Sequence, residues 1–490
     1  MSHADPASGA PPGSSSGASP GAGPVPPTVA PPPPVPARLG LVAATALVMG
    51  NVIGVGVFQL PAAVAGFGTI GIVAFAVIGA CSILLAVVFG WLAQRLPDTG
   101  GPYVYAREAF GELPGFLTAW SYWITAWASN AALVVAWAGY VNVLVPLPGT
   151  GRALAVTVGA LWLAVLANLA GVRGAGMIAV VTTVLKFVPL VLVAVVGLFF
   201  VRAENFGPFV ADGGDALGSL TAAGAVLMFS FLGVESAAVA AEEVHEPRRN
   251  VMRATVIGTL VSAVVYLLGT VAVFGLVPHG DLARSTAPYA DAARAIFGGG
   301  QAAGTVLAAA AVISGAGTLV GWTLVSARMP YAAARDGLFP EIFRAVNRRG
   351  APWAGLVVSG ALASLLTLAN YTGGLQSAFT ALALLTTFTA AVPYIFSAAA
   401  QLLWLLTDRG PEGRPVSTAR LARDVIIALV AVAFTLWLVA GAGYAAVYQG
   451  VLLVLAGIPV YVWMRWRAVV RAGGRNVRGG ASGTVKPQVR

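Results

Sequence analysis

The stretch GNVIGVGVFQLP at residues 50–61 places three glycines, Gly50, Gly54 and Gly56, and a polar Asn51 at mid-depth in an apolar segment. Residues 40–62 are long enough to cross a bilayer as a helix. Clustered glycines favour an interruption of that helix, and exposed backbone groups are tolerated in a membrane only where they line a cavity. The alternative interpretation is that these glycines serve close packing between helices.

A second segment of the same kind lies between Phe229 and Ser236, inside the apolar stretch 218–241. It reads FSFLGVES and again combines glycine with polar groups at mid-depth. If the chain holds two repeats of five helices, the two interrupted helices occupy corresponding positions. Such a pair indicates a midplane binding site in transporters with inverted repeats. The halves show no direct sequence repeat, so the symmetry is an inference.

The composition places the chain in a membrane. Of its 490 residues, 58% are hydrophobic and only 9% are charged, and the mean hydropathy is +0.84. Soluble domains are about a quarter charged, and the chain lacks the alternating pattern of a membrane barrel. We therefore expect an all-α bundle whose spans are 40–62, 69–94, 114–144, 153–172, 175–201, 218–241, 254–277, 303–331, 353–370, 376–406, 422–441 and 445–466.

The net charge of +10 reports the topology of these spans. With the N-terminus inside, the outer loops carry only Arg152, Arg202, Arg284 and Arg294, and the remaining arginines outside the spans fall in cytoplasmic loops and ends. This asymmetry is the positive-inside rule, which predicts a multi-pass plasma-membrane protein with both termini in the cytoplasm. The lipid bilayer thus explains the basic residues, and nucleic acid is not expected as a partner.

Three regions follow from composition. Residues 1–37 are rich in Pro, Ala, Gly and Ser, and we expect a disordered cytoplasmic tail. Residues 38–467 form the predicted transporter domain, and 468–490 form a basic cytoplasmic tail. Cys81 is the single cysteine, and the three histidines lie outside the spans. No metal site, cofactor or catalytic pair is therefore expected within the bundle, and a channel would need a continuous polar pore.

The two interruptions predict what is bound. Free N–H groups around Asn51 to Gly56, at the start of a half-helix, would attract an anion. Freed carbonyls around Phe229 to Leu232 would receive an ammonium group. A zwitterion whose charges are one carbon apart fits this pairing, so the residues favour an α-amino acid.

Two ionisable residues lie deep in the predicted spans. Glu235 is the one acidic residue at such depth, and Lys186 lies about 18 Å from the inner end of its span at 1.5 Å per residue. Because charge in hydrocarbon is costly, both are candidates for coupling transport to protons. The alternatives are a protonated, hydrogen-bonded Glu235 and a structural ammonium that holds backbone carbonyls.

Four further polar or amphipathic side chains lie at cavity depth: Tyr122, Asn130, Trp322 and Thr386. Each of them alone fits interhelical packing as well as a role as ligand.

Longer motifs give a specific resemblance. They are GNVIGVGVFQLP at 50–61, GGPYVYAREAFG at 100–111, FSFLGVESAAVAAEEVHEPRRNV at 229–251 and GWTLVSARMPYAAARDGLFP at 321–340. Together they resemble the amino acid–polyamine–organocation superfamily over nearly all of 38–466, especially the bacterial arginine/agmatine and putrescine/ornithine exchangers. The resemblance implies a twelve-helix transporter with a five-plus-five inverted repeat and broken helices 1 and 6.

The resemblance also implies roles for individual residues. Asn51, Val52, Gly54 and Gly56 match the carboxylate-binding turn, and Glu235 matches a coupling carboxylate. The remaining matches are the cavity residues Tyr122 and Asn130, the inner gate aromatic Trp322, and Phe379 and Thr386, where helix 10 lines the pocket.

Four positions depart from the arginine exchangers. Val55, Phe229 and Leu133 stand where those proteins have Ser, Trp and Met, which puts arginine specificity in doubt, although Phe229 keeps an aromatic face for a cationic or apolar side chain. Lys186 resembles the proton-coupled, sodium-independent branch, where a lysine of helix 5 occupies the space of a sodium ion, with Ser314 and Thr318 nearby as candidate partners.

The predicted function is therefore proton-coupled, sodium-independent transport of amino acids, with cationic amino acids or polyamines within its range. Exchange of the arginine/agmatine type is the alternative. The substrate and the oligomeric state stay open, a homodimer included.

Overall fold

The computed structural model describes residues 39–97, 100–171, 175–371, 373–407 and 418–479. The predicted tail 1–37 and residues 480–490 lie outside these ranges. Within them every regular element is a helix, and the one β-type contact is an isolated bridge between Leu39 and Val244. The prediction of an all-α fold is confirmed for this part of the chain.

Nine helical segments of the described residues are long and apolar enough to cross a membrane. They are α3 (Ile70–Arg95), α5 (Glu112–Leu144), α6 (Thr150–Ala170), α10 (Pro247–Leu276), α13 (Gln301–Arg335), α14 (Trp353–Asn370), α15 (Leu375–Thr407), α16 (Thr418–Gly441) and the stretch Gly443–Arg467, which joins α17 (Gly443–Leu455) to the start of α18 (Gly457–Gly479). The chain is thus a multi-pass membrane protein.

The other predicted spans are shorter or bent. The first consists of α1 (Leu41–Val52) and the segment Val55–Ala65, which meet at an angle of 48°. That segment is a 3₁₀ turn, η1 (Val55–Gln59), followed by α2 (Leu60–Ala65). Two further apolar segments, Leu185–Phe200 and Ala216–Phe231, belong to α7 (Ala175–Val196) with η2 (Gly197–Phe200) and to α8 (Ala216–Leu227) with η4 (Met228–Phe231).

Short helices join these segments. They are α4 (Pro102–Phe110), η3 (Ala203–Asn205), α9 (Ser236–Val239), η5 (Ala241–Glu243), α11 (His279–Leu282), α12 (Pro288–Ile296) and η6 (Glu341–Arg344). The segment between α10 and α13 thus contains two short helices, α11 and α12. Helix α10 begins before the predicted residue 254, because Pro247 suits the first helical turn. Helix α18 runs on past residue 467 to Gly479.

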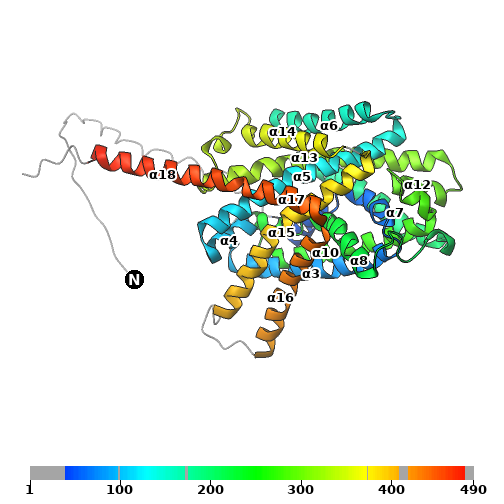
Figure 1. Cartoon of the computed structure of the whole chain (residues 1–490), viewed down its shortest axis with the longest axis horizontal. Helices are drawn as coiled ribbons and strands as arrows, with labels where there is room; N and C mark the ends of the chain where they lie inside the picture. Colours follow the sequence, from blue (N-terminus) through cyan, green and yellow to red (C-terminus); the bar gives the residue numbers. More distant parts are fainter. Residues whose placement is uncertain (1–38, 98–99, 172–174, 372, 408–417, 480–490) are drawn as a thin grey trace, which may run out of the picture. The chain divides into compact units, whose positions relative to one another are not determined.

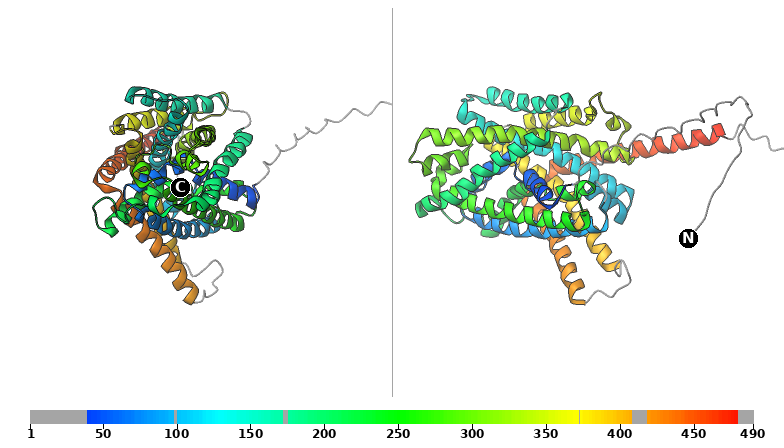
Figure 2. Two further views of the ribbon diagram at one scale, coloured as in Figure 1. Left: turned by 90° about the vertical axis from the view of Figure 1, so that its right-hand side faces the viewer. Right: turned by 180° about the vertical axis from the view of Figure 1, so that it is seen from behind.

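Helices α5 and α13 form the centre of the bundle, where they pack on each other. Helix α5 also packs extensively against α15, and α13 packs against α7. Helices α6 and α14 lie side by side along one edge and contact α13 and α5 in turn (Figures 1 and 2). In the apolar part of α5, 89% of the residues are buried, so this helix is surrounded by protein.

Small residues allow the close helix packing. A side chain at Gly258 of α10 would come within 2.9 Å of Val48 in α1, and one at Gly90 of α3 within 2.6 Å of Met252 in α10. Close approach of this kind is typical of helix packing in membranes, where dispersion contacts replace the hydrophobic effect between helices. It holds α1, α3 and α10 together beside the site.

Candidate substrate site

The first predicted interruption is present between α1 and η1. The last helical bond of α1 runs from Ile53 N to Met49 O at 2.7 Å, and Gly54 is extended, with φ −96° and ψ 170°. Gly54 N donates to Val52 O at 3.0 Å, and the bond after that joins Val57 N to Gly54 O at 3.2 Å. The amides of Val55 and Gly56 therefore have no backbone acceptor among the described residues, as expected for the first turn of a new helix.

The second interruption lies between η4 and α9. Leu232 is extended, with φ −63° and ψ 136°, and Gly233 has a φ of +97°, a value that glycine adopts at little cost. The carbonyls of Ser230 and Leu232 accept no backbone hydrogen bond within the described part of the chain. The second break thus leaves acceptors free where the first leaves donors.

The two breaks touch each other. A side chain at Gly233 would lie 3.1 Å from the backbone of Asn51, and one at Gly56 would overlap the ring of Phe229. Gly54 faces Leu133 of α5, whose Cδ2 atom would lie 3.1 Å from an added Cβ. Gly56 and Gly54 at the first break are thus required because η4 and α5, respectively, approach them closely.

A cavity of about 20 Å³ lies between the breaks. This volume admits roughly one water molecule, so the cavity has almost no free space in this conformation. Its walls come from both breaks, from α5 and from α13: Asn51, Val52, Gly54, Gly56, Val57, Ser129, Leu133, Phe229, Ser230, Leu232 and Trp322. Six of the predicted site residues are therefore brought together here.

Four predicted site residues lie outside this cavity wall. Phe379 of α15 stands behind Phe229, with the ring centroids 5.6 Å apart and the planes nearly perpendicular. Thr386 donates its hydroxyl to Leu382 O within α15. Asn130 is buried beside Ser326 of α13 at a donor–acceptor distance of 3.5 Å, and its Oδ1 atom has no partner in the described residues. Tyr122, the fourth, contacts Glu235.

Glu235 is held by two tyrosines. Tyr122 of α5 donates its hydroxyl to Oε1 at 2.7 Å, and Tyr394 of α15 donates to Oε2 at 2.8 Å. Glu235 is only 1% exposed, and both of its carboxylate oxygens accept a hydrogen bond. Because Tyr122 precedes Ser129 by about two helical turns, this cluster lies nearer the beginning of α5 than the cavity does. The Glu235 carboxyl group thus links the segment before α9 to α5 and to α15, on the side of the cavity nearer the beginning of α5.

Lys186 lies behind the first break. Its ammonium donates to the carbonyl of Gly50, the last turn of α1, at 3.0 Å, and the residue is 3% exposed. Ser314 and Thr318 of α13, the candidate partners, donate instead to carbonyls of their own helix. The lysine therefore holds the end of α1 from α7.

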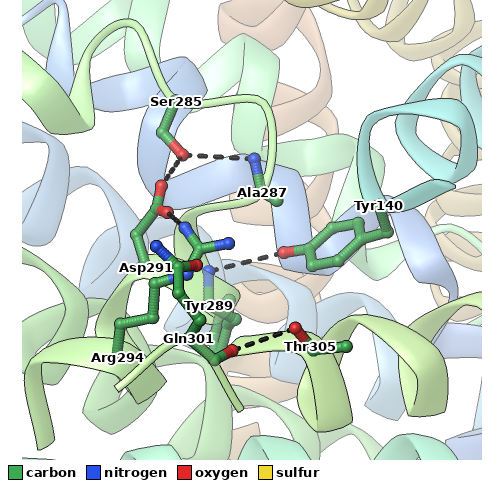
Figure 3. Close-up of polar contacts among 8 residues, drawn as sticks. All are labelled: Tyr140, Ser285, Ala287, Tyr289, Asp291, Arg294, Gln301 and Thr305. Carbon is green, nitrogen blue, oxygen red and sulfur yellow. Dashed lines mark hydrogen bonds and ion pairs between the residues drawn. The ribbon is translucent and has the colours of Figure 1, made fainter. Parts of the chain in front are cut away.

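At the opposite end of α5 a cap covers the site. Ser285 donates its hydroxyl to Asp291 and accepts from the amide of Ala287 at 3.1 Å, and Arg294 pairs with Asp291 at 2.6 Å (Figure 3). These contacts make the segment Pro278–Ile296 a preorganised unit.

The cap is fastened to the bundle at two places. The Gln59 amide of η1 donates to Ser285 O at 3.0 Å and to the Gln376 side chain of α15. Tyr140 of α5 donates to Phe58 O at 2.9 Å and accepts from Tyr289 N at 3.4 Å, the bond drawn in Figure 3. Contacts between helices thus lie on both sides of the cavity, at Glu235 and at the cap.

Two polar contributors, Ser129 and Tyr394, were not predicted. Ser129 precedes Asn130 and lies two turns from Tyr122, the spacing that puts residues on one helix face, and this spacing could have indicated it. Tyr394 was overlooked although a tyrosine beside Pro393 inside a span is a polar group at depth.

The chain matches the amino acid permease family over residues 39–464. It belongs to that family. This permease is 30% identical over 452 residues to a putative arginine/ornithine antiporter of Bacillus subtilis, covering 85% of this chain and 95% of the relative. It is 31% identical to a putrescine transporter of Escherichia coli, with 86% and 95% covered, and 32% identical to an arginine/ornithine antiporter of Pseudomonas aeruginosa, with 86% and 89% covered.

These matches confirm the resemblance found in the motifs and identify the chain as a transporter of amino acids or amines, not an enzyme. The residue ranges of the family match and of the predicted transporter domain, 39–464 and 38–467, nearly coincide.

Proposed function

We propose that this permease carries out secondary active transport of amino acids by alternating access, coupled to protons and independent of sodium. The observation that carries the proposal is the meeting of two broken helices around one small cavity, where, among the described residues, one break has amides and the other has carbonyls without a backbone partner. A site between two breaks, with contacts between helices on both sides of it, suits a carrier that opens to one side at a time.

The packing supports a five-plus-five inverted repeat within twelve spans. If α3 and α10, α5 and α13, α6 and α14, and α7 and α15 are equivalent, each contact in one half should recur in the other. The contact of α1 with α10 is matched by α8 with α3, that of α7 with α13 by α15 with α5, and that of α6 with α13 by α14 with α5. The two breaks then occupy equivalent places, as transporters with inverted repeats require.

The backbone groups at the breaks define the part of the substrate that is recognised. The amides of Val55 and Gly56 can receive an α-carboxylate, and the dipole of the following helical turn favours an anion there. The carbonyls of Ser230 and Leu232 can receive the α-ammonium. Charge-assisted bonds are the strong class of hydrogen bond, so these contacts would fix the orientation of an amino acid.

The other residues of the cavity select the substrate by its side chain. Phe229, backed by Phe379, presents an aromatic face suited to a cation or an apolar group. The buried Ser129 hydroxyl of the cavity wall has no partner among the described residues and can accept from an amino group. Asn130 lies behind the wall, and its amide oxygen also has no partner in the described residues. The relatives are named for arginine, ornithine and putrescine, so cationic amino acids and polyamines are the first substrates to test.

Glu235 is the group we propose for coupling. A change in its charge alters bonds to α5 and α15 at once, because Tyr122 and Tyr394 each bind one of its oxygens. Protonation of Glu235 would weaken these charge-assisted bonds and release one end of the cavity. Movement of a proton would in this way accompany opening.

The proposal that transport is independent of sodium rests on Lys186. Its ammonium supplies positive charge next to the end of α1 through Gly50 O, the space that the related proton-coupled branch fills with a lysine in place of a sodium ion. The antiporter relatives favour a second candidate function, exchange of an amino acid for an amine without net proton movement.

For orientation, we propose that both termini face the cytoplasm. Three candidate spans end or begin in a cluster of arginines: α3 ends at Arg95, α5 begins after Arg107, and α13 ends at Arg335. This basic end of the bundle is the cytoplasmic one by the positive-inside rule, which puts the cap over Pro278–Ile296 outside.

Reconstituted proteoliposomes test the function directly. Labelled L-arginine, L-ornithine, neutral amino acids and putrescine are offered with the interior at neutral pH and the exterior acidic, with no gradient, and with unlabelled substrate inside. Proton coupling predicts accumulation driven by acid outside and unaffected by sodium. Uptake that requires internal substrate and ignores the proton gradient would support exchange, and flux that does not saturate would exclude a carrier.

A further inference from the structure

A second, larger pocket of about 370 Å³ opens at the basic end of the bundle. It lies between the α4–α5 junction, the turn from α13 to η6, and the start of α18. Its charged lining comprises Arg107, Glu112, Arg335, Asp336, Glu341, Arg344, Arg465 and Arg467. A volume of this size accommodates a small ligand, and no part of the transport cycle proposed above uses it.

The pocket lies where spans leave the membrane. Helix α5 begins at Glu112, α13 ends at Arg335, and the last apolar stretch ends at Arg467, and all three residues line the pocket. The ends of apolar spans mark the level of the lipid head groups. The pocket therefore faces the polar surface of one leaflet.

The acidic residues of the pocket already have partners. Glu112 pairs with Arg465, and Asp336 accepts the Tyr103 hydroxyl at 2.9 Å and lies 3.8 Å from Arg107. Burial and the adjacent Asp336 carboxylate raise the pKa of Tyr103, so it stays protonated and keeps donating. These contacts leave the pocket an excess of positive charge.

Arg335 and Arg344 provide that excess. Both side chains line the pocket and are exposed, and neither forms a salt bridge with any residue in the described ranges. Two guanidinium groups presented to one pocket are suited to a phosphate, which they bind through paired hydrogen bonds.

An apolar stripe adjoins the pocket on α18. Trp463 lines the pocket and stacks under Arg467, with the guanidinium 4.7 Å from the ring centroid. On the adjacent face Val462 and Trp466, one turn apart, are 59% and 60% exposed. Exposed tryptophan beside arginine at the end of a span is typical of the membrane interface, and a soluble phosphate compound would leave this stripe uncovered.

We infer that this pocket binds an anionic phospholipid, with the phosphate between Arg335 and Arg344 and the acyl chains along Val462 and Trp466. The inference concerns binding, and only the choice of the inner leaflet rests on the orientation proposed above. The bound lipid joins the α13–η6 turn to α18, two segments far apart in sequence.

Native mass spectrometry of the purified full chain tests this, with phosphatidylglycerol, phosphatidylcholine and sn-glycerol 3-phosphate as probes. Phosphatidylglycerol should bind at least tenfold more tightly than phosphatidylcholine. One cation near an anionic lipid contributes about fivefold to binding, so Arg335→Gln with Arg344→Gln should lower its affinity by about 25-fold. Arg335→Lys with Arg344→Lys keeps both charges but not the paired hydrogen bonds, so it should recover part of the loss, which excludes misfolding as the cause.

Arg248→Gln with Arg249→Gln is the matched control, because these two exposed arginines of α10 lie outside the pocket. Their removal should change phosphatidylglycerol binding less than twofold. An equal loss in the control would replace the pocket with unspecific charge attraction and overturn the inference. Binding of sn-glycerol 3-phosphate as tight as that of the lipid would also overturn it. Because no transport is measured, these results are independent of the proposed function.

Discussion

The two breaks that meet at the cavity differ in how they are stabilised. The break after α1 consists of Ile53 and Gly54, and its neighbours are backbone, Leu133 and the Lys186 contact at Gly50. The break before α9 carries its own charge, Glu235, tied to α5 and α15 by two tyrosines. Two similar interruptions can therefore have different roles: the first offers a rigid backbone pocket, and the second offers a titratable bond between helices.

The largest effect should come from closing the first break with a side chain. Gly56→Leu would place a side chain within the ring of Phe229, and we expect uptake by proteoliposomes to fall more than a hundredfold while the protein still reaches the membrane. Gly66→Leu is the control, since nothing lies within 4 Å of a Cβ built there. Near-normal uptake by Gly56→Leu would remove the carboxylate site from this break.

The second break should fail in another way. Glu235→Gln keeps the size of the side chain but fixes it as neutral, so we expect substrate binding within about threefold of wild type and turnover lowered by about tenfold to a hundredfold, without its pH dependence. Initial rates from pH 5 to 8 measure this, with the exposed Glu204→Gln as control. A wild-type pH profile in Glu235→Gln would show that the carboxylate does not couple transport to protons.

Much of this comparison was readable from the sequence. The glycines around Gly54 and the motif at Phe229 predicted both breaks, because backbone that leaves a helix in a membrane must be built from residues that tolerate it. The depth of Glu235 followed from its position along an apolar stretch. Local composition and spacing carry such information.

The tertiary partners were not readable. Tyr394 lies 159 positions from Glu235 and Gln376 lies 317 positions from Gln59, and no spacing rule connects residues on different helices. For the same reason the sequence indicated Ser314 and Thr318 as candidate partners of Lys186, whereas in the structure its ammonium donates to Gly50 O. The small volume of the cavity, about 20 Å³, results from tertiary packing of this kind.

Lys186 is the charged residue that contacts the first break. Lys186→Ala removes the ammonium at Gly50 O, and we expect acid-driven accumulation to fall by about tenfold, while substrate binding to the purified protein changes less than threefold. Both quantities are measured on one preparation. Full acid-driven accumulation by Lys186→Ala would favour exchange as the transport mode.

The smallest effects should follow from removing one hydrogen bond at the second break. Tyr122→Phe and Tyr394→Phe each leave Glu235 with the other tyrosine, so turnover should fall about threefold to tenfold in either variant. The double variant should approach Glu235→Gln, because both carboxylate oxygens then lose their donors. The exposed Tyr448→Phe provides the control. Additive, independent effects would contradict a shared role for the two tyrosines.

If one break receives the carboxylate and the other the ammonium of the same substrate, both groups of the substrate are needed for binding. Competition for the binding of labelled L-ornithine to the purified protein tests this, using L-ornithine methyl ester and Nα-acetyl-L-ornithine. Each analogue loses charge-assisted bonds to one break, so each should bind at least tenfold more weakly than L-ornithine. Displacement by the methyl ester at the same concentration as L-ornithine would contradict the assignment of the first break.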